Sequence, residues 1–125
     1  NKIMAAFQLP KGTDEEKAAR KQAIEDATKY AIDVPFTVIE TTLESMETIK
    51  VMAEIGNPNS VSDAGVGALC ARSAVIGAYL NVKINAAGLD DKEFAKRKLE
   101  AATALVDKAK SLETEILATV EKKIG

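Results

Sequence analysis

The segment of residues 64–80 most constrains the fold of this chain, because it holds a single charged residue, Arg72, among apolar and small side chains. Three of the small residues are glycines: Gly65, Gly67 and Gly77. A glycine in a helix interior costs roughly 1 kcal/mol relative to alanine, so a compensating interaction is needed. The pattern therefore predicts a central, buried helix over about residues 61–87, with neighbouring helices approaching closely at its glycines.

A membrane-spanning helix is the alternative for this segment, since small residues also pack helices in lipid. Spanning a bilayer takes about 20 consecutive apolar residues. Arg72 stands near the middle of the segment, and Asn81 and Lys83 follow it. We therefore expect no membrane contact.

Two further helices are expected before the central one, in addition to a short apolar helix within residues 1–9. Thr13 and Glu16 have the spacing of a capping box, which predicts a helix start near Asp14. Pro35 is expected to kink or break this helix around residues 32–34, because proline lacks an N–H and its ring clashes with the preceding turn. The helical spacing of apolar residues resumes after Pro35 and ends at Gly56. The expected buried positions are Ala23, Ile24, Ala27, Ala31, Val34, Phe36, Ile39, Leu43, Met46, Ile49, Val51 or Met52, and Ile55.

Residues 57–59 read as a tight loop, after which Ser60 and Asp63 have the spacing of a helix cap. Gly88 is expected to end the central helix. Asp90, with Glu93, is expected to begin the last one, which could run to about Lys123. Its expected core positions are Ala102, Leu105, Ala109, Leu112 and Ile116.

The sequence thus predicts an all-α fold: one domain over residues 1–125, an antiparallel helical bundle with a small-residue-rich central helix and a long C-terminal helix. At 1.5 Å per residue the last helix would reach roughly 45 Å. That is longer than a compact domain of this size needs, so part of it is expected to pack against another subunit or an N-terminal portion.

Composition excludes several kinds of chemistry. The chain has no histidine and one cysteine, so catalytic triads and His- or Cys-rich metal sites are excluded. Cys70 has no cationic neighbour one turn away and is expected to be a small core residue. The net charge of −2 gives no reason to expect nucleic acid as a partner. The cysteine count fits a reducing cytoplasm.

The central helix carries a stripe that is polar at both ends and small in the middle. At 100° per residue its other members lie within about 40° of Asp63: Gly67, Cys70, Ala74, Gly77, Asn81 and Asn85. Asp63 and Asn81 would stand about 27 Å apart along the axis. They therefore belong to two sites, grip two ends of a long ligand, or meet across a dimer.

Each polar residue also has a purely structural interpretation. Asp63 in a first helical turn is often only a dipole partner. Asn57 and Asn59 could be ordinary turn residues. Asn81 and Asn85 could hydrogen-bond between helices instead of binding a ligand.

At these residues the chain resembles the cyclodeaminase and cyclohydrolase family of folate enzymes, whose members act on formimino- or methenyl-tetrahydrofolate. The resemblance covers essentially the whole chain and rests on four groups of residues in compatible order: residues 9–20 (Leu9, Pro10, Lys11, Thr13, Glu15, Glu16, Lys17, Arg20), Val34-Pro35, residues 56–63 and residues 77–85.

The resemblance implies an all-α homodimer that takes a folate substrate, with no cofactor and no metal. It implies Asp63 as the group that transfers a proton or stabilises the substrate cation. It also implies five substrate-binding residues: Asn57, Asn59, Ser60, Asn81 and Asn85. Whether the reaction is deamination or hydrolysis stays open.

One departure concerns a Pro-Gly-Gly-Gly-Ser loop in the N-terminal region of family members, which this chain lacks. We therefore expect a fragment, the C-terminal part of a cyclodeaminase-like domain, that holds part of an active site and is inactive alone. The alternative function is a non-catalytic helical oligomerisation or scaffold module, in which Asn81 and Asn85 only bridge helices.

Overall fold

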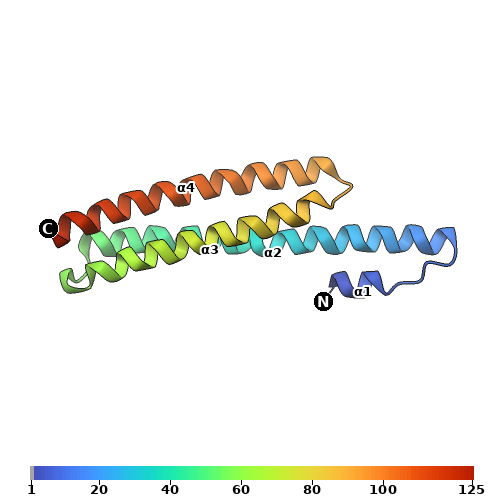
Figure 1. Ribbon diagram of the computed structural model, residues 1–125, viewed down its shortest axis with the longest axis horizontal. Helices are drawn as coiled ribbons and strands as arrows, with labels where there is room; N and C mark the ends of the chain where they lie inside the picture. The colour runs from blue at the N-terminus through green and yellow to red at the C-terminus, as the bar shows by residue number, and fades with distance from the viewer. Residues whose placement is uncertain (1) are drawn as a thin grey trace.

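The computed structural model describes residues 2–125, and within them it contains helices and no strand. The elements are α1 (Lys2–Phe7), α2 (Asp14–Ile55), the short 3-10 turn η1 (Pro58–Ser60), α3 (Val61–Ala87) and α4 (Lys92–Ile124). Helices α2, α3 and α4 run antiparallel in succession, and α1 folds back along the first part of α2 (Figure 1). The all-α antiparallel bundle is confirmed; Asn1 lies outside the described residues.

The start of α2 is confirmed as predicted. The Glu16 backbone N–H donates to Thr13 Oγ1 at 3.2 Å, and the Thr13 N–H donates to Glu16 Oε2 at 3.1 Å. These two bonds close a capping box and satisfy N–H groups that have no partner inside the helix. The acidic first turn adds a favourable interaction with the helix dipole.

The predicted break at Pro35 is wrong, because α2 continues for 42 residues through that position. The proline removes one helical hydrogen bond and crowds the preceding turn. Ile32 and Ile39 stand on either side of it, and both are fully buried. The burial of both halves against the same neighbours therefore keeps the helix in one piece.

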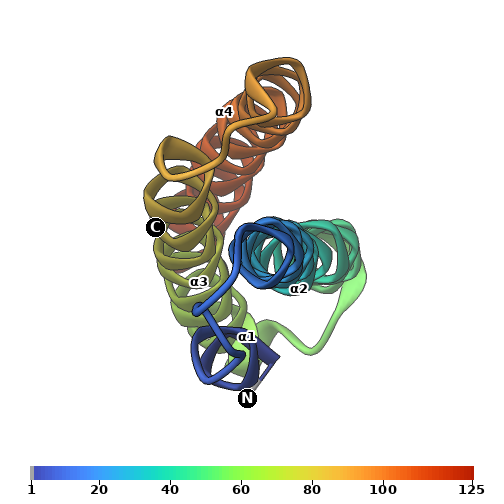
Figure 2. The same cartoon turned by 90° about the vertical axis from the view of Figure 1, so that its right-hand side faces the viewer.

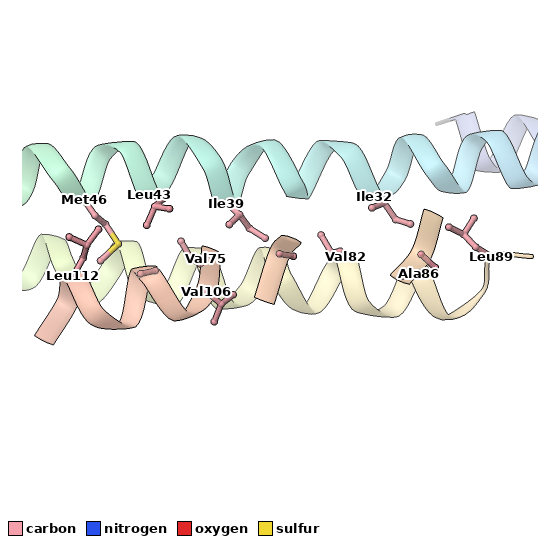
Figure 3. Packing of buried hydrophobic residues seen from close by; sticks show 13 residues of the cluster. Ile32, Ile39, Leu43, Met46, Val75, Val82, Ala86, Leu89, Val106 and Leu112 are labelled. Atoms are coloured by element: carbon pink, nitrogen blue, oxygen red, sulfur yellow. The ribbon is translucent and has the colours of Figure 1, made fainter. Parts of the chain in front are cut away.

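The main core lies where α2, α3 and α4 meet. Figure 3 shows Ile32, Ile39 and Met46 of α2 pointing toward α3, whose Val75 and Val82 face them. Most core predictions for α4 are confirmed, since four positions are buried and Leu105 is half-buried: Ala102, Ala109, Leu112 and Ile116.

The predicted core stripe of α2 is confirmed at most positions and wrong at Val34 and at the C-terminal end of the helix. Ala27, Ile39, Leu43 and Met46 are buried, and five others are half-buried: Ala23, Ile24, Ala31, Phe36 and Ile49. Val34 is 50% exposed and Ile55 is 76% exposed. Val51 and Met52 are also exposed, whereas Ala53 next to them is buried, so another side of the last turns of α2 faces the neighbouring helices.

Helix α3 has the predicted bounds but is buried along one face only. Viewed end-on, α3 contacts α2 and α4 and leaves its outer side uncovered (Figure 2). Four large apolar side chains lie on that exposed side: Val66, Leu69, Leu80 and Ile84. Cys70 is exposed too, so its predicted place in the core is wrong.

The glycines of α3 also differ in whether a neighbouring helix lies beside them. A Cβ at Gly65 would lie 3.4 Å from Val120 Cγ1 of α4, and one at Gly67 would lie 3.5 Å from Ile49 Cδ1 of α2. Both are ordinary van der Waals contacts with side chains, so neighbouring helices pack at Gly65 and Gly67 without the close backbone approach that was predicted. A Cβ at Gly77 would meet nothing within 4 Å among the described residues, so the prediction is wrong there as well.

By length and composition, the helical stretch Pro58–Ala87 could cross a membrane, and 33% of its apolar window is buried inside the fold. The core helix of a water-soluble protein passes the same test. The absence of membrane contact therefore stays a prediction.

The last helix begins one residue later than predicted. Asp91, not Asp90, is the N-cap, and its Oδ1 accepts a hydrogen bond from the Phe94 N–H at 3.0 Å. Asp90 instead pairs with Lys21 of α2, 2.8 Å away. Gly88 ends α3, as expected.

Candidate functional site

The turn between α2 and α3, residues 56–63, forms the candidate site. It leaves α2 at Gly56, whose N–H donates to the Met52 carbonyl oxygen at 2.8 Å. A Cβ at Gly56 would collide with that same oxygen. Only glycine therefore fits here, and the chain can turn away from α2 immediately after its last hydrogen bond.

Asn57 organises the turn. Its Oδ1 accepts a hydrogen bond from the Asn59 N–H at 3.0 Å, and its carbonyl oxygen accepts one from the Ser60 N–H at 2.9 Å. The structural interpretation of Asn57 as a turn residue is therefore correct for its side-chain oxygen. The Nδ2 group of Asn57 forms no hydrogen bond with residues 2–125 and remains available.

Ser60 and Asp63 follow at the start of α3. Ser60 is the N-cap residue of α3, as predicted, but its side chain makes no capping hydrogen bond within residues 2–125. The 3-10 turn capped by Asn57 leads into the helix. Asp63 lies in the first turn of α3, where the helix dipole favours a negative charge. Its exposed carboxylate has no ion pair or hydrogen bond with the described part of the chain.

These residues border a cavity of about 350 Å³ between the end of α2 and the start of α3. Asn57, Ser60 and Asp63 form its polar side. The remaining lining comes from five less polar residues: Thr48, Ile49, Met52, Gly56 and Ala64. An unpaired carboxylate beside an apolar wall suits a flat, positively charged organic group, which the wall can contact while the carboxylate neutralises it.

Asn59 is exposed and does not line this cavity, although it belongs to the same turn. Three of the six predicted site residues therefore border one cavity, and a fourth, Asn59, lies beside it. The remaining two, Asn81 and Asn85, stand on later turns of α3, away from the cavity.

Asn81 and Asn85 hydrogen-bond within their own helix. Asn81 Nδ2 donates to the Gly77 carbonyl at 3.1 Å, and Asn85 Nδ2 donates to the Asn81 carbonyl at 2.9 Å. The suggestion that they bridge helices within the chain is therefore wrong. Their Oδ1 acceptors have no hydrogen-bond donor within residues 2–125, and Asn81 is exposed.

A second cavity, which sequence reasoning missed, lies near the start of α2. It measures about 440 Å³, and four basic residues help to line it: Lys11, Lys17, Arg20 and Lys21. Three of them already have partners. Lys17 pairs with Asp14 at 2.9 Å, Lys21 with Asp90 at 2.8 Å, and Arg20 Nη2 donates to the Phe7 carbonyl at 3.2 Å.

Those partners show what the basic residues do. Lys21 donates a hydrogen bond to Asp90, and this bond raises the pKa of Lys21 above its ordinary value because it stabilises the charged form. Arg20 ties α1 to α2. Arg20 and Lys21 therefore fasten α1 and the α3–α4 turn to α2, whereas Lys17 pairs within α2. Only the grouping of residues 9–20 in sequence could have pointed to these residues.

No group of three or more His, Cys, Asp or Glu residues suited to a metal ion occurs within residues 2–125. The expected absence of a metal and of a cofactor stays a prediction.

Comparison with known proteins adds the following. The family model described as formiminotransferase-cyclodeaminase matches residues 1–104. Methenyltetrahydrofolate cyclohydrolase of Methylorubrum extorquens is 43% identical over 123 residues, which are 98% of this chain and 59% of that protein. Formimidoyltransferase-cyclodeaminases of Gallus gallus and Rattus norvegicus are 36% and 30% identical over 96% of this chain and 22% of theirs. The chain thus spans under two thirds of each of these relatives.

Proposed function

Because the chain belongs to the formiminotransferase-cyclodeaminase family, we propose that it is part of a folate one-carbon enzyme, and that its reaction is the hydrolysis of methenyl-tetrahydrofolate. The single observation that carries this choice is the 43% identity to a methenyltetrahydrofolate cyclohydrolase, of which the chain covers 59%. The cyclodeaminase relatives are less similar, at 36% and 30%.

The chemistry fits the residues of the α2–α3 turn. A methenyl bridge between two folate nitrogens is a delocalised cation. Water adds to its carbon and loses a proton, which leaves a neutral carbinolamine. One carbon–nitrogen bond then breaks as the released nitrogen takes up a proton and the hydroxyl loses its own, which gives the formyl group. This sequence needs one group that stabilises positive charge and moves a proton, and it needs no metal.

Asp63 is the residue we assign to that role, because its carboxylate is unpaired and borders the cavity. The free Nδ2 of Asn57 and the hydroxyl of Ser60 would orient the pterin ring from the same side. Asn59, exposed on this turn, would contact the part of the substrate outside the cavity.

Cyclodeamination is the second candidate, supported by the description of the matching family and by the cyclodeaminase relatives. In that reaction a folate nitrogen attacks the formimino carbon and ammonia leaves. The same carboxylate would serve, since this reaction also takes one proton and gives one. The two activities are separated by assaying ammonia release beside methenyl hydrolysis.

The decisive experiment measures turnover of both substrates by the full protein and by its Asp63→Asn variant. We expect kcat/KM to fall by roughly 100-fold or more, as for other acid–base groups. Asp14→Asn is the matched control, because Asp14 is also an exposed aspartate in the first turn of a helix. Near-normal rates in Asp63→Asn would remove Asp63 from the mechanism. If the full protein turns over neither substrate and binds no folate, the scaffold function is favoured.

The remaining properties of the whole protein are proposals as well. We place it in the cytoplasm as a homodimer, without a cofactor and without nucleic acid or membrane partners. A single cysteine and a net charge of −2 support the location and the absence of nucleic acid. Residues 1–125 alone are expected to be inactive, which a direct comparison with the full protein would test.

A further inference from the structure

A third cavity lies between the last turns of α3 and the first turns of α4. It measures about 450 Å³ and takes its lining from both helices. Lys83 in that lining stands 20 positions after Asp63 on α3, hence about 30 Å along the helix axis. The α2–α3 turn and the α3–α4 turn lie at opposite ends of α3 (Figure 1). This cavity is therefore separate from the one beside Asp63.

Positive charge gathers around the third cavity. Lys83 of α3 lines it together with Lys92 and Lys96 of α4. Among the described residues of the lining, Glu100 is the only acidic one, so three lysines and one glutamate leave two net positive charges. None of the three lysines forms an ion pair within residues 2–125.

Lysines farther along α4 are neutralised by the fold. Lys98 and Lys108 pair with acidic residues of α2 at 2.7 and 3.0 Å. Lys92 and Lys96, in contrast, stand four residues apart on one helix, where like charges repel each other. The fold thus holds positive charge at this cavity without enough acidic groups of its own to balance it.

A structural role accounts for one of these lysines. Lys92 Nζ donates a hydrogen bond to the carbonyl oxygen of Leu89, in the turn that follows α3. Lys83 and Lys96 make no hydrogen bond, ion pair or ring contact with the described part of the chain. Their ammonium groups therefore remain available to an anion from solution.

The deeper part of the lining is apolar. Ala86 and Ala95 are 2% and 6% exposed, and Leu99 is half-buried. Such a wall can contact the uncharged part of a ligand while a few polar groups fix its charged part. The cavity therefore suits a molecule that joins a small apolar or aromatic body to a strongly charged anionic group.

A phosphate fits that anionic group better than a carboxylate does. A lysine ammonium is a point charge with three donors, and it lacks the planar fork with which arginine matches a carboxylate. A phosphate monoester carries about 1.5 to 2 negative charges at neutral pH and has three strong acceptor oxygens. This charge matches the two net positive charges of the lining.

We infer that the cavity between α3 and α4 binds a phosphate monoester of a small apolar or aromatic alcohol. Lys83 and Lys96 hold the phosphate, and Ala86, Ala95 and Leu99 contact the organic part. A small ester bound here cannot reach the candidate site of the same chain, about 30 Å away along α3. It is thus a second ligand, and the inference does not depend on the proposed reaction.

Calorimetric titration of the full protein with phenyl phosphate, at low ionic strength and pH 8, is the first test. We expect one ester per chain with a Kd of about 1 mM or lower. Lys83→Gln combined with Lys96→Gln should raise Kd by at least about 10-fold, because charge-assisted hydrogen bonds are lost. A wild-type Kd above about 10 mM would overturn the proposal.

Lys122→Gln is the matched control for the double variant. Lys122 is an exposed lysine in the last turn of α4 and has no ion pair within residues 2–125. Its replacement should leave Kd unchanged. An equal loss of affinity in the control and in the double variant would show only general attraction to a basic surface, and would overturn the site.

A further variant tests the position of the ester without removing a lysine. Ala87 is exposed and lines the cavity, so Ala87→Glu should fold normally and abolish measurable binding by adding negative charge. Ala101→Glu, at an exposed position of α4, should bind as wild type does. Circular dichroism checks the folding of both. Unchanged binding by folded Ala87→Glu would place the ester elsewhere and contradict the inference.

Two other probes test the chemistry of the ligand. Inorganic phosphate lacks the apolar body and benzoate lacks the phosphate, so each should bind at least about fivefold more weakly than phenyl phosphate. Affinity for phenyl phosphate should also fall between about pH 8 and pH 5.5, because the ester gains a proton near pH 6. Equal affinity for benzoate would overturn the choice of phosphate, and equal affinity for inorganic phosphate would overturn the role of the apolar wall.

Discussion

The two turns between the long helices of this protein are built in opposite ways. The α3–α4 turn, residues 88–91, is fastened to α2 from several directions: Glu25 accepts hydrogen bonds from the Asp90 and Asp91 N–H groups at 3.1 and 2.9 Å. Lys29 pairs with Asp91 at 2.7 Å. Leu89 beneath them is fully buried.

The α2–α3 turn is bonded mainly to itself. Asn57 closes it locally. Within residues 2–125 the Ser60 hydroxyl makes no capping hydrogen bond, and the Asp63 carboxylate has no hydrogen bond or ion pair. A cavity of about 350 Å³ opens beside it. One turn therefore uses its polar groups for stability, whereas the other leaves the Ser60 hydroxyl and the Asp63 carboxylate without hydrogen bonds within the described residues.

The largest effect on stability is expected at Leu89. Leu89→Ala should lower the free energy of unfolding by about 2–5 kcal/mol, since it removes a fully buried side chain and leaves a cavity. Ile55→Ala, beside the other turn, should cost less than about 0.5 kcal/mol, because Ile55 is 76% exposed. Urea denaturation of both variants measures the difference. Equal losses would contradict the contrast between the turns.

A smaller effect is expected from acid at the α3–α4 turn. The hydrogen bond from Lys29, with that from the Phe94 N–H, holds the pKa of Asp91 below its ordinary value of 3.8. A carboxylate with a lowered pKa in the folded state stabilises above its unfolded pKa, and this contribution is lost as pH falls through the folded pKa. Stability should therefore decrease below about pH 5, and less steeply in Asp91→Asn.

Urea midpoints measured from pH 7 to pH 3 check this expectation. Lys29→Gln serves as the reciprocal control, because it removes the main cause of the lowered pKa of Asp91. Superimposable pH profiles for wild type and Asp91→Asn would show that this pair contributes nothing to the pH dependence.

The smallest effect is expected at Ser60. Ser60→Ala should change the free energy of unfolding by less than about 0.5 kcal/mol, because its hydroxyl makes no capping bond. Thr13→Ala, at a helix start whose capping bond is made, should cost about 1 kcal/mol. Thermal denaturation compares the two. A loss at Ser60 as large as that at Thr13 would mean that the turn depends on its hydroxyl.

The sequence predicted the features that depend on neighbouring residues. The capping box at Thr13, the bounds of α3 and the turn at Asn57 follow from local hydrogen bonding, and all three are confirmed. Most of the core repeat of α4 is confirmed because a long amphipathic helix shows its buried face directly.

Features that depend on distant residues could not be predicted in this way. Pro35 was expected to kink or break α2, but the helix runs through it without a break, because burial on both sides outweighs its local cost. Which face of α3 is buried depends on which helices lie beside it. Because small residues occur all around α3, its sequence does not indicate which face contacts the other helices. Glu25 fastens a turn 65 residues away, which no local pattern reveals.

The two turns also differ in when they can form as the chain folds. The α2–α3 turn closes between helices that follow one another in sequence, so it requires little loss of chain entropy. The α3–α4 turn is complete only when Glu25 meets Asp90 across those 65 residues, after α2 and α3 have docked. We therefore expect the cavity beside Asp63 to form early in folding and the contacts around Leu89 to form last.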